Sequence, residues 1–407
     1  MYFSSKIPLL LDGATGTNLL AAGMPHGVCV EQWICENPEP LQTLQKRYKA
    51  AGSSIISAPT FGANRMKLED YGLGEKTAEL NRRLVEITRE AVGAEVLVAG
   101  DVSPTGRFIE PFGDTTFDEL YECYKEQIRA QREAGADLIF CETMLSLAEA
   151  RAAVIAANEE DIPVFVSFTV DEHGRTLTGA QLLPCLITLQ AMGAAAVGLN
   201  CSGGPEEIAE FIEEAKPYAD IPLIAKPNAG KPLNEAGTEY ELSAERFAPY
   251  LYPLLKAGAR YIGGCCGTTP VHIKLLKSAL DKAVIPALPE SEDVLAAASE
   301  TQAFFLSDHM EMSDPIECGY DLADDLIDLE DERVNVARVR VSSAEDAEEL
   351  ARNAHMSHLP IAILPQNAEC LERALRLYQG RAIIDSGCGL PPGELLPAAQ
   401  KYGAIII

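Results

Sequence analysis

The sequence predicts an α/β protein, a (β/α)8 (TIM) barrel followed by a smaller α/β domain. Eight short apolar runs alternate with longer segments of helical period between about residues 7 and 285. The runs are apolar throughout, which is typical of parallel strands buried on both faces. Polar and glycine-rich residues follow the runs, and a barrel would gather these strand ends at one face. A doubly wound open sheet is the competing arrangement, and this ring of polar strand ends favours the barrel.

The predicted strands of the barrel are short. They lie at residues 8–11, 54–58, 96–99, 137–141, 163–168, 195–199, 222–225 and 260–263. Amphipathic segments at 40–50, 77–92, 117–134 and 243–257 are the predicted helices between them. A glycine precedes the next strand at four junctions, where it would end a helix in the left-handed conformation: Gly52, Gly135, Gly193 and Gly258.

The composition changes after about residue 286. Residues 286–350 hold 19 Asp and Glu against three Arg and no Lys. They lack the glycine-turn spacing of a calcium-binding loop, so we expect a solvated acidic face. Further on, strands are predicted at 334–341, 360–364 and 382–384, and helices at 344–354, 368–379 and 392–402.

The chain divides into a barrel (1–287), a linker (288–300) and a small acidic α/β domain (301–407), whose role the sequence does not reveal. The last four residues, Ala404 to Ile407, are strand-forming and apolar. Domain ends are usually exposed and polar. We therefore expect the small domain to be truncated and the native polypeptide to continue past Ile407.

Charge and cysteine content restrict the possible partners. The 407 residues carry a formal net charge of −28, which argues against nucleic acid and anionic membrane surfaces as partners. The sequence shows no secretory signal and no apolar run of membrane-spanning length. Eleven cysteines without framework spacing fit a reducing compartment. The sequence thus predicts a cytoplasmic protein without nucleic-acid or membrane partners.

Three cysteines at predicted strand ends form the strongest motif. Cys265 and Cys266 stand between glycines after the eighth strand, and Cys201 follows the sixth. Adjacent side chains of a strand point to opposite faces, but flanking glycines permit a backbone that directs both thiols to one atom. Three thiolates with one open position would form a catalytic zinc site.

Other interpretations of these cysteines remain. A structural zinc site usually has four ligands, often in paired CxxC motifs. A disulfide between Cys265 and Cys266 would be strained, and any single cysteine can simply be buried. A zinc–thiolate centre instead favours deprotonation of a bound substrate thiol near neutral pH. The indicated chemistry is transfer of a methyl group to a small thiol.

These motifs together resemble the homocysteine S-methyltransferase family. The similarity rests on residues 12–17, 60–64, 142–143, 198–201 and 263–270, and extends over about residues 7–285. The family includes betaine–homocysteine methyltransferase and the homocysteine-binding module of cobalamin-dependent methionine synthase. The resemblance implies a (β/α)8 barrel with Zn²⁺ on Cys201, Cys265 and Cys266, homocysteine as methyl acceptor and methionine as product.

The resemblance also implies roles for the substrate-binding residues. Asp12 and Glu142 match carboxylates that hold the substrate ammonium group, although Asp12 could merely form a turn and Glu142 could be a helix-start charge. The backbone N–H groups of the loop containing Gly13, Ala14 and Thr15 match the site of the substrate carboxylate. Asn200 is a further candidate for substrate binding. Asn228 could be a weak oxygen ligand to zinc or a turn asparagine.

The sequence leaves the methyl donor open. We find no cobalamin-binding Asp-x-His-x-x-Gly segment, and residues 290–407 are too few for a full pterin-binding barrel. The donor would be methylcobalamin on another module, S-methylmethionine or a betaine. The chain is therefore predicted to be a zinc-dependent methyltransferase. Alternatively, it is a homocysteine-binding module that presents the thiolate to a methylcobalamin-carrying domain and is inactive alone.

Overall fold

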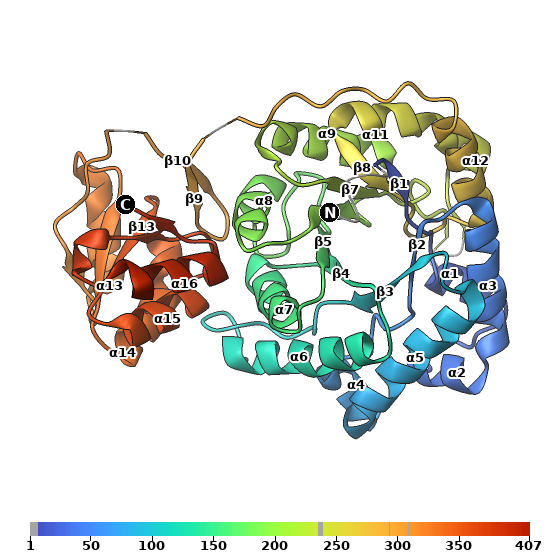
Figure 1. The fold of residues 1–407 in the computed structure, drawn as a ribbon, viewed down its shortest axis with the longest axis horizontal. Coiled ribbons are helices and arrows are strands. Elements are labelled where there is room, and N and C mark those ends of the chain that lie inside the picture. The colour runs from blue at the N-terminus through green and yellow to red at the C-terminus, as the bar shows by residue number, and fades with distance from the viewer. Residues whose placement is uncertain (1–6, 235–238, 293, 308) are drawn as a thin grey trace.

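The computed structural model describes residues 7–234, 239–292, 294–307 and 309–407. Its first part holds a sheet of eight parallel strands in the order β1-β8-β7-β6-β5-β4-β3-β2 (Figure 1). The strands are β1 (Leu9–Leu10), β2 (Ile55–Ser57), β3 (Leu97–Val102), β4 (Leu138–Met144), β5 (Val164–Phe168), β6 (Ala196–Asn200), β7 (Leu223–Lys226) and β8 (Ala259–Ile262). All eight coincide with predicted strands.

The sheet closes on itself through its first strand. β1 pairs with β8 in parallel, and across the β1–β2 seam the Ser54 N–H donates to the Leu10 carbonyl at 2.7 Å. An open doubly wound sheet has two free edges, so this closure excludes it and confirms the barrel.

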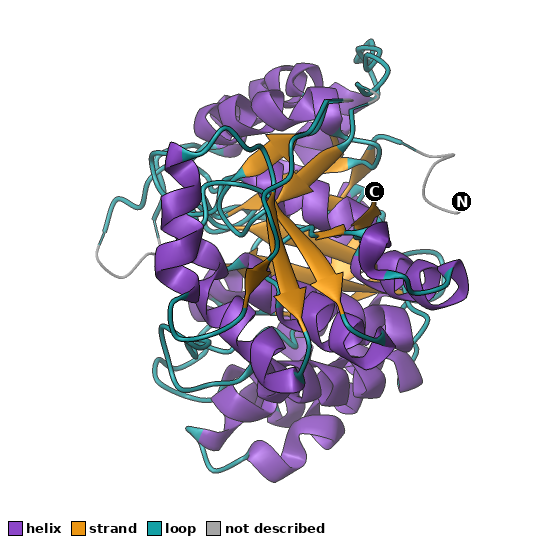
Figure 2. Ribbon diagram, turned by 90° about the vertical axis from the view of Figure 1, so that its left-hand side faces the viewer, coloured by secondary structure: helices purple, strands orange, loops and turns teal. Residues whose placement is uncertain are grey.

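Figure 2, viewed from the left-hand side of Figure 1, shows helices outside the strands in the molecule as a whole. The helices of the barrel connect its strands. They are α1 (Gly16–Ala21), α2 (Val30–Glu36), α3 (Pro38–Ala51), α4 (Arg65–Glu69), α5 (Thr77–Val92), α6 (Phe117–Glu133), α7 (Leu147–Glu159), α8 (Leu182–Ala191), α9 (Pro205–Ala215), α10 (Ala244–Phe247), α11 (Leu251–Ala257) and α12 (Pro270–Leu280). The predicted helix at 243–257 is broken into α10 and α11 by a 3-10 turn that contains Pro249. Proline lacks the N–H that a continuous helix requires.

The barrel interior is apolar in its middle layer and polar toward the carboxyl ends of the strands. Its apolar layer includes Ala99, Phe140, Ala196 and Ile224, and Phe165 stacks on Tyr261 with ring centroids 4.9 Å apart. Inward positions recur every second residue along a strand. Inward positions further toward the carboxyl ends are polar: Asp101, Glu142, Ser167 and Lys226 come two residues after members of this layer, and Asn200 comes four residues after Ala196.

A second parallel sheet lies beyond the barrel. Its strands β11 (Ile316–Glu317), β12 (Ala337–Val341), β13 (Ile361–Pro365), β14 (Ile383–Ile384) and β15 (Ile405–Ile406) follow one another in chain order. Helices α13 (Leu322–Asp328), α14 (Ala344–Asn353), α15 (Ala368–Leu377) and α16 (Pro392–Tyr402) connect them. Strands β12, β13 and β14 and helices α14, α15 and α16 coincide with predicted elements, and β15 lies in the strand-forming run 404–407, whereas β11 and α13 were not predicted.

Part of the predicted linker belongs to the second sheet region. Within residues 288–300, β9 (Ala296–Ala298) pairs in antiparallel fashion with β10 (Ala303–Phe305). Ala298 also exchanges two backbone hydrogen bonds with Arg381, at 2.9 and 3.0 Å. The end of this segment is thus fixed to the second domain.

The second domain packs on helices α6–α8 of the barrel (Figure 1). Helix α7 is buried along nearly its whole length, and one apolar cluster runs from the barrel through α7 to α15 and α16. The buried Arg151 guanidinium of α7 donates to the Leu375 carbonyl at 2.8 Å. Asp118 of α6 accepts from Arg373 and Arg376 at 2.6 and 2.7 Å. The two domains therefore share one core.

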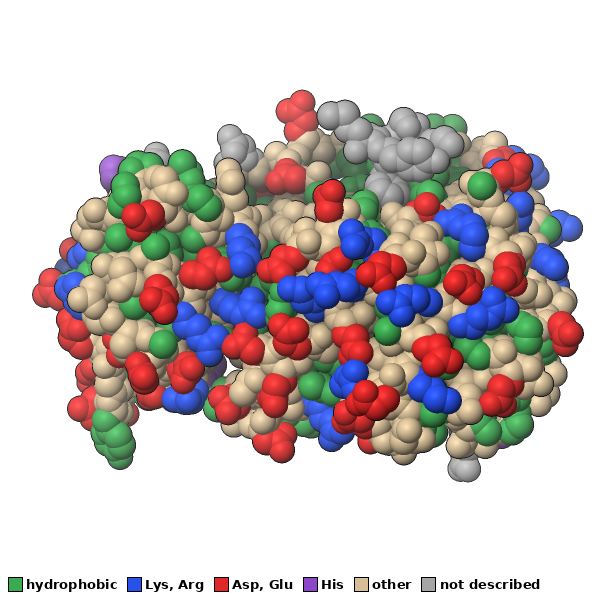
Figure 3. All heavy atoms as spheres, turned by 60° about the horizontal axis from the view of Figure 1, so that its bottom comes forward, with side chains coloured by type: hydrophobic (Ala, Val, Ile, Leu, Met, Phe, Trp, Pro, Cys, Tyr) green, Lys and Arg blue, Asp and Glu red, His purple; other side chains and the backbone are tan. Residues whose placement is uncertain are grey.

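Charges on the outer surface are mixed. On the face drawn in Figure 3, Lys and Arg lie among Asp and Glu. Ion pairs between partly exposed side chains include Arg82–Glu133 at 2.7 Å. The Asp side chains of α13 are exposed, in agreement with a solvated acidic face. Within the described ranges, no helix combines the length and the apolar character needed to cross a membrane.

Candidate metal centre and substrate pocket

The turn after β8 directs Cys265 and Cys266 toward the barrel mouth. The Gly264 N–H donates to the Asp12 carbonyl at 3.0 Å, and the Cys265 N–H donates to the Pro227 carbonyl at 2.8 Å. A Cβ on Gly264 would lie 2.4 Å from Thr268 Oγ1, so only glycine fits there. The turn is thus tied to the ends of β1 and β7.

Cys201 reaches the same point from β6. Its φ angle is 55°, a left-handed value that is uncommon for residues other than glycine and often marks functional sites. Its Sγ lies 3.7 Å from the Sγ of Cys266, and the three Sγ atoms all lie within 4.8 Å of one another. All three cysteines are free.

This sulfur geometry fits a zinc ion. A tetrahedral site with Zn–S bonds of about 2.3 Å has S···S edges of about 3.8 Å, close to the 3.7 Å separation of Cys201 and Cys266. Hydrogen bonds from Cys201, Cys265 and Tyr240 lower the pKa of Cys266, while the same hydrogen bonds between the thiols raise the pKa of Cys201 and leave that of Cys265 raised. Without a cation, the cluster therefore favours a single thiolate, on Cys266, and a thiolate is a metal ligand.

Asn228, predicted as a possible oxygen ligand, lies in the backbone segment that is hydrogen-bonded to the Cys265–Cys266 turn. The neighbouring Ala229 N–H donates to the Cys266 carbonyl at 2.9 Å, and the Asn228 N–H donates to Gly203 at 3.0 Å. Its Oδ1 is buried and accepts no hydrogen bond from any described residue. A buried amide oxygen without a donor is available to a cation.

Tyr240 is a further neighbour of the thiols that the sequence analysis did not identify. Its hydroxyl hydrogen-bonds Cys266, and burial together with that cysteine raises the pKa of Tyr240 to about 12. Its ring covers Gly267, where a Cβ would lie 2.2 Å from Tyr240 Cγ. Nothing in the loop sequence marks this tyrosine, because its contact with Cys266 depends on how the β7–α10 loop folds back.

Two predicted carboxylates, Asp12 and Glu142, face a lysine that was not predicted. The Lys226 Nζ lies 2.8 Å from Glu142 Oε2 and 3.4 Å from Asp12 Oδ1. Burial lowers the pKa of Lys226, but Glu142 and Asp12 outweigh it and the net pKa is raised well above the ordinary value. Burial is also the main cause of the raised pKa of both acids. The only sequence signal for Lys226 is a charge directly after an apolar strand.

Asn200 is fully hydrogen-bonded within the protein. Its Oδ1 accepts from the Thr143 N–H at 2.8 Å and from Ser167 Oγ at 2.7 Å. Its Nδ2 donates to Thr143 Oγ1 at 2.7 Å and lies 3.8 Å from Cys265 Sγ. Asn200 thus links the residue after Glu142 to one of the thiols.

The loop that contains Gly13, Ala14 and Thr15 borders the thiols from the β1 side. The Ala14 N–H donates to Thr268 Oγ1 at 3.1 Å, and that hydroxyl donates to the Cys265 carbonyl at 2.7 Å. The N–H groups of Gly13 and Thr15 bond to no other described residue. The loop is therefore held in place while part of its donor set stays open.

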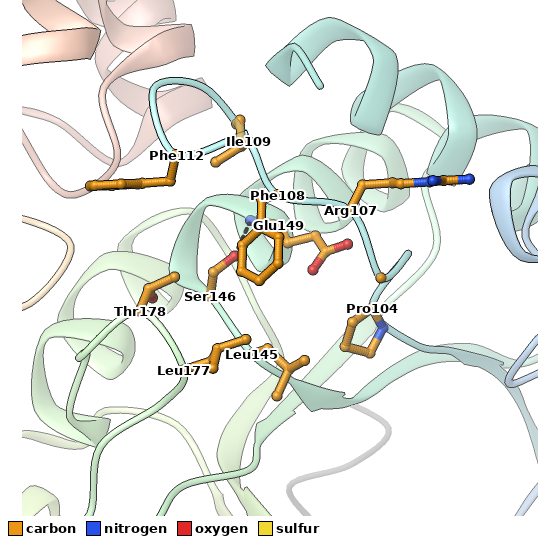
Figure 4. A pocket seen from close by; sticks show the side chains of 11 residues that line it. Pro104, Arg107, Phe108, Ile109, Phe112, Leu145, Ser146, Glu149, Leu177 and Thr178 are labelled. Carbon is orange, nitrogen blue, oxygen red and sulfur yellow. Dashed lines mark hydrogen bonds between the residues drawn. The ribbon is translucent and has the colours of Figure 1, made fainter. Parts of the chain in front are cut away.

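A second hollow lies on the same side of the barrel as the thiols. It has a volume of about 420 Å³ and lies between the loops after β3, β4 and β5. Figure 4 shows the Glu149 carboxylate among the lining residues, with the Phe108 ring beside it. Its lining is mainly apolar and includes Pro104, Ile109, Phe112, Leu145 and Leu177.

Fold and site together define a (β/α)8-barrel protein whose polar and thiol side chains meet at the carboxyl ends of the strands, where barrel enzymes carry their active sites. The family model described as homocysteine S-methyltransferase matches residues 9–280. The chain belongs to this family, which confirms the resemblance seen in its sequence.

Individual relatives agree with this assignment. Methionine synthase of Mycobacterium leprae (strain TN) is 32% identical over 301 residues, which cover 69% of this chain and 25% of that protein. Methionine synthase of Mycobacterium tuberculosis (strain ATCC 25618 / H37Rv) is 32% identical over 289 residues, 66% of this chain and 24% of that protein. The chain thus spans about a quarter of these relatives.

A solved structure matches over nearly its whole length. The metallated form of the homocysteine methyltransferase MmuM from Escherichia coli aligns with a TM-score of 0.58 and 26% identity, covering 68% of this chain and 98% of that one. Its oxidized form aligns with a TM-score of 0.57 and 28% identity, over 66% and 95%. The barrel is the part held in common.

Proposed function

We propose that this protein transfers a methyl group to the thiol of homocysteine, giving methionine. The observation that carries the proposal is the convergence of three free thiols within 4.8 Å in a barrel of the homocysteine S-methyltransferase family. Cys201, Cys265 and Cys266 would hold Zn²⁺, with Asn228 as a weak additional ligand. When bound, the zinc would lower the pKa of the substrate thiol and so favour the nucleophilic thiolate.

The remaining polar groups would orient the amino-acid end of homocysteine. The acidic end of the pocket, formed by Asp12 and Glu142 around Lys226, would receive the ammonium group. The open N–H groups of Gly13 and Thr15 would receive the carboxylate, since clustered N–H donors suit an anion. Asn200 would hold Cys265 and the carboxyl end of β4 in fixed positions relative to each other. Fixing both ends directs the thiol toward the three cysteines.

Two forms of this function differ in the methyl donor. In the first, a small donor such as S-methylmethionine or a betaine enters the mouth and the chain is a complete methyltransferase. In the second, the chain presents the thiolate to a methylcobalamin-carrying domain or partner and is inactive alone. The second form is supported by the match to methionine synthases over a quarter of their length.

Metal content and binding test the acceptor half of the proposal. We expect about one zinc per chain in the wild type, little in Cys266→Ala, and an unchanged content in the matched control Cys388→Ala of the second domain. Homocysteine binding, measured by calorimetry, should be retained in the variants that retain zinc and lost in those that lose it. A metal-free protein with full activity would refute the proposal.

The donor is tested separately with zinc-loaded wild-type protein. Methionine formation is measured with homocysteine and S-methylmethionine, glycine betaine or free methylcobalamin. Turnover with a small donor supports the complete enzyme. Homocysteine binding without turnover on the two small donors supports the presenting module.

A further inference from the structure

One buried carboxyl at the barrel mouth has no partner. Asp101 occupies the first inward position above Ala99 on β3 and is 5% exposed. Its carboxyl makes no hydrogen bond or ion pair to any residue in the described part of the chain, and its Oδ1 is fully buried. A buried acid left unpaired costs stability, so a carboxyl in this state calls for a function.

The backbone of Asp101, in contrast, is held firmly. Its N–H donates to Thr60 Oγ1 at 2.9 Å, and its carbonyl accepts from that hydroxyl at 2.8 Å. The same carbonyl accepts from Gln131 Nε2 at 3.1 Å. The residue is fixed in position while its carboxyl points inward with unused acceptor capacity, which is the arrangement expected of a preorganised ligand group.

Asp12 is more engaged than Asp101. Its Oδ2 accepts from the Ser57 N–H at 2.8 Å, and its Oδ1 faces the Lys226 ammonium at 3.4 Å. Glu142 uses only Oε2, at 2.8 Å from Lys226, and its side chain is 13% exposed. Each of these carboxyls keeps unused lone pairs, and Asp101, on the strand next to that of Glu142, keeps the most.

We propose that Asp101 joins Asp12 and Glu142 in accepting the ammonium group of the amino-acid substrate. The inference rests on the proposed function, because it concerns the acceptor bound in that site. Three acidic side chains and one lysine leave the apo site with more carboxyl groups than cations. A substrate ammonium supplies a further cation and has three N–H donors for the open oxygens.

The experiment compares two thiols in the zinc-loaded full chain. Homocysteine carries the ammonium group, and 4-mercaptobutanoate is the same molecule without it. A hydrogen bond to a charged group contributes about 1.5–3 kcal/mol, so Asp101→Asn should weaken homocysteine binding about 10–150-fold. It should leave 4-mercaptobutanoate binding nearly unchanged. Asp114→Asn, at an exposed position on the loop after β3, is the matched control and should affect neither.

The outcomes separate this inference from the function on which it rests. A wild type that binds no homocysteine would refute the proposed function itself. If the wild type binds homocysteine but Asp101→Asn weakens both thiols equally, or neither, the assignment of Asp101 is wrong. Circular dichroism and thermal melting of Asp101→Asn verify that the variant is folded. Should it not fold, Asp101→Ser is subjected to the same pair of ligands.

Discussion

Replacing Lys226 with methionine should destabilise the barrel strongly, because one buried ammonium serves two buried carboxylates. The side chains of Lys226 and Asp12 are each 3% exposed, and that of Glu142 is 13% exposed. Removing one partner of a buried ion pair costs about 3–5 kcal/mol, since the remaining charge is left uncompensated. At an m value of about 3 kcal/mol/M, the urea midpoint would fall by roughly 1–2 M.

The pH dependence of this loss has a defined sign. Lys226 lowers the pKa of Asp12 and Glu142 against the larger raising effect of burial. Without the lysine, both acids would keep folded-state pKa values further above their unfolded values. A carboxyl group whose pKa is higher in the folded than in the unfolded state binds more protons when folded, so the free energy of unfolding falls as the pH rises. The deficit of Lys226→Met should therefore be largest near pH 8 and shrink as the pH falls toward the ordinary values of 3.8 and 4.5.

Urea unfolding at several pH values, followed by circular dichroism, tests this reasoning. Lys231→Met, at an exposed position five residues further along, is the matched control and should stay within about 0.5 kcal/mol of wild type. The double variant Lys226→Met/Glu142→Gln should recover part of the loss, because it removes one of the uncompensated charges. A Lys226→Met midpoint equal to that of Lys231→Met at pH 8 would refute the argument.

Three further predictions concern other parts of the chain. Burial and Glu142 raise the pKa of Asp101, so Asp101→Asn should stabilise the apo protein at neutral pH, with a gain in urea midpoint that disappears as pH falls toward 3.8. Tyr240→Phe should weaken zinc binding about 10–100-fold in chelator competition, because outer hydrogen bonds tune metal ligands, whereas Tyr250→Phe should not. Deleting residues 296–407 should uncover helix α7 and cause aggregation measurable by light scattering, and a monodisperse truncated barrel would contradict it.

The sequence predicted the barrel because its strands are short, apolar and regularly spaced. Each run had to be buried on both faces, and each was followed by polar residues. The thiol cluster was predictable for a related reason. Cysteines beside glycines at the ends of strands 6 and 8 must meet at the mouth if the sheet closes, and the pairing of β1 with β8 shows that it does.

The buried charged residues Lys226 and Asp101 were not predictable in the same way. Lys226 and Asp101 each follow an apolar run, where a charge is usually a solvated turn residue. Their burial depends on facing inward in a closed barrel, and that depends on strand register. A one-residue shift would place either side chain among the outer helices. Register is a property of the assembled sheet and is not visible in a single strand.

Helix α7 shows a similar limit at the scale of domains. Its sequence is apolar nearly all round, with Arg151 among alanines, and a helix of that kind is expected to be covered on every side. The sequence predicted two domains but no contact between them, so the element that covers α7 was not predicted. Arg151 is buried and donates to carbonyls at the end of α15, so the cover is the second domain. A barrel helix that is apolar on nearly every side, in a chain with a second domain, thus predicts that the second domain packs on that helix.

The charge balance at the mouth bears on which thiols the site can accept. Asp12 and Glu142 face one lysine, Asp101 lies on the strand next to that of Glu142, and all four groups are buried or nearly so. A substrate without a positive group would leave this excess of carboxyl groups unpaired and would bring a carboxylate of its own. Under the proposed function, a substrate with an α-ammonium group would supply a further cation to these acceptors. Asp12, Asp101 and Glu142 would then discriminate against thiols that lack an ammonium group. The three cysteines would determine only which substrate atom reacts.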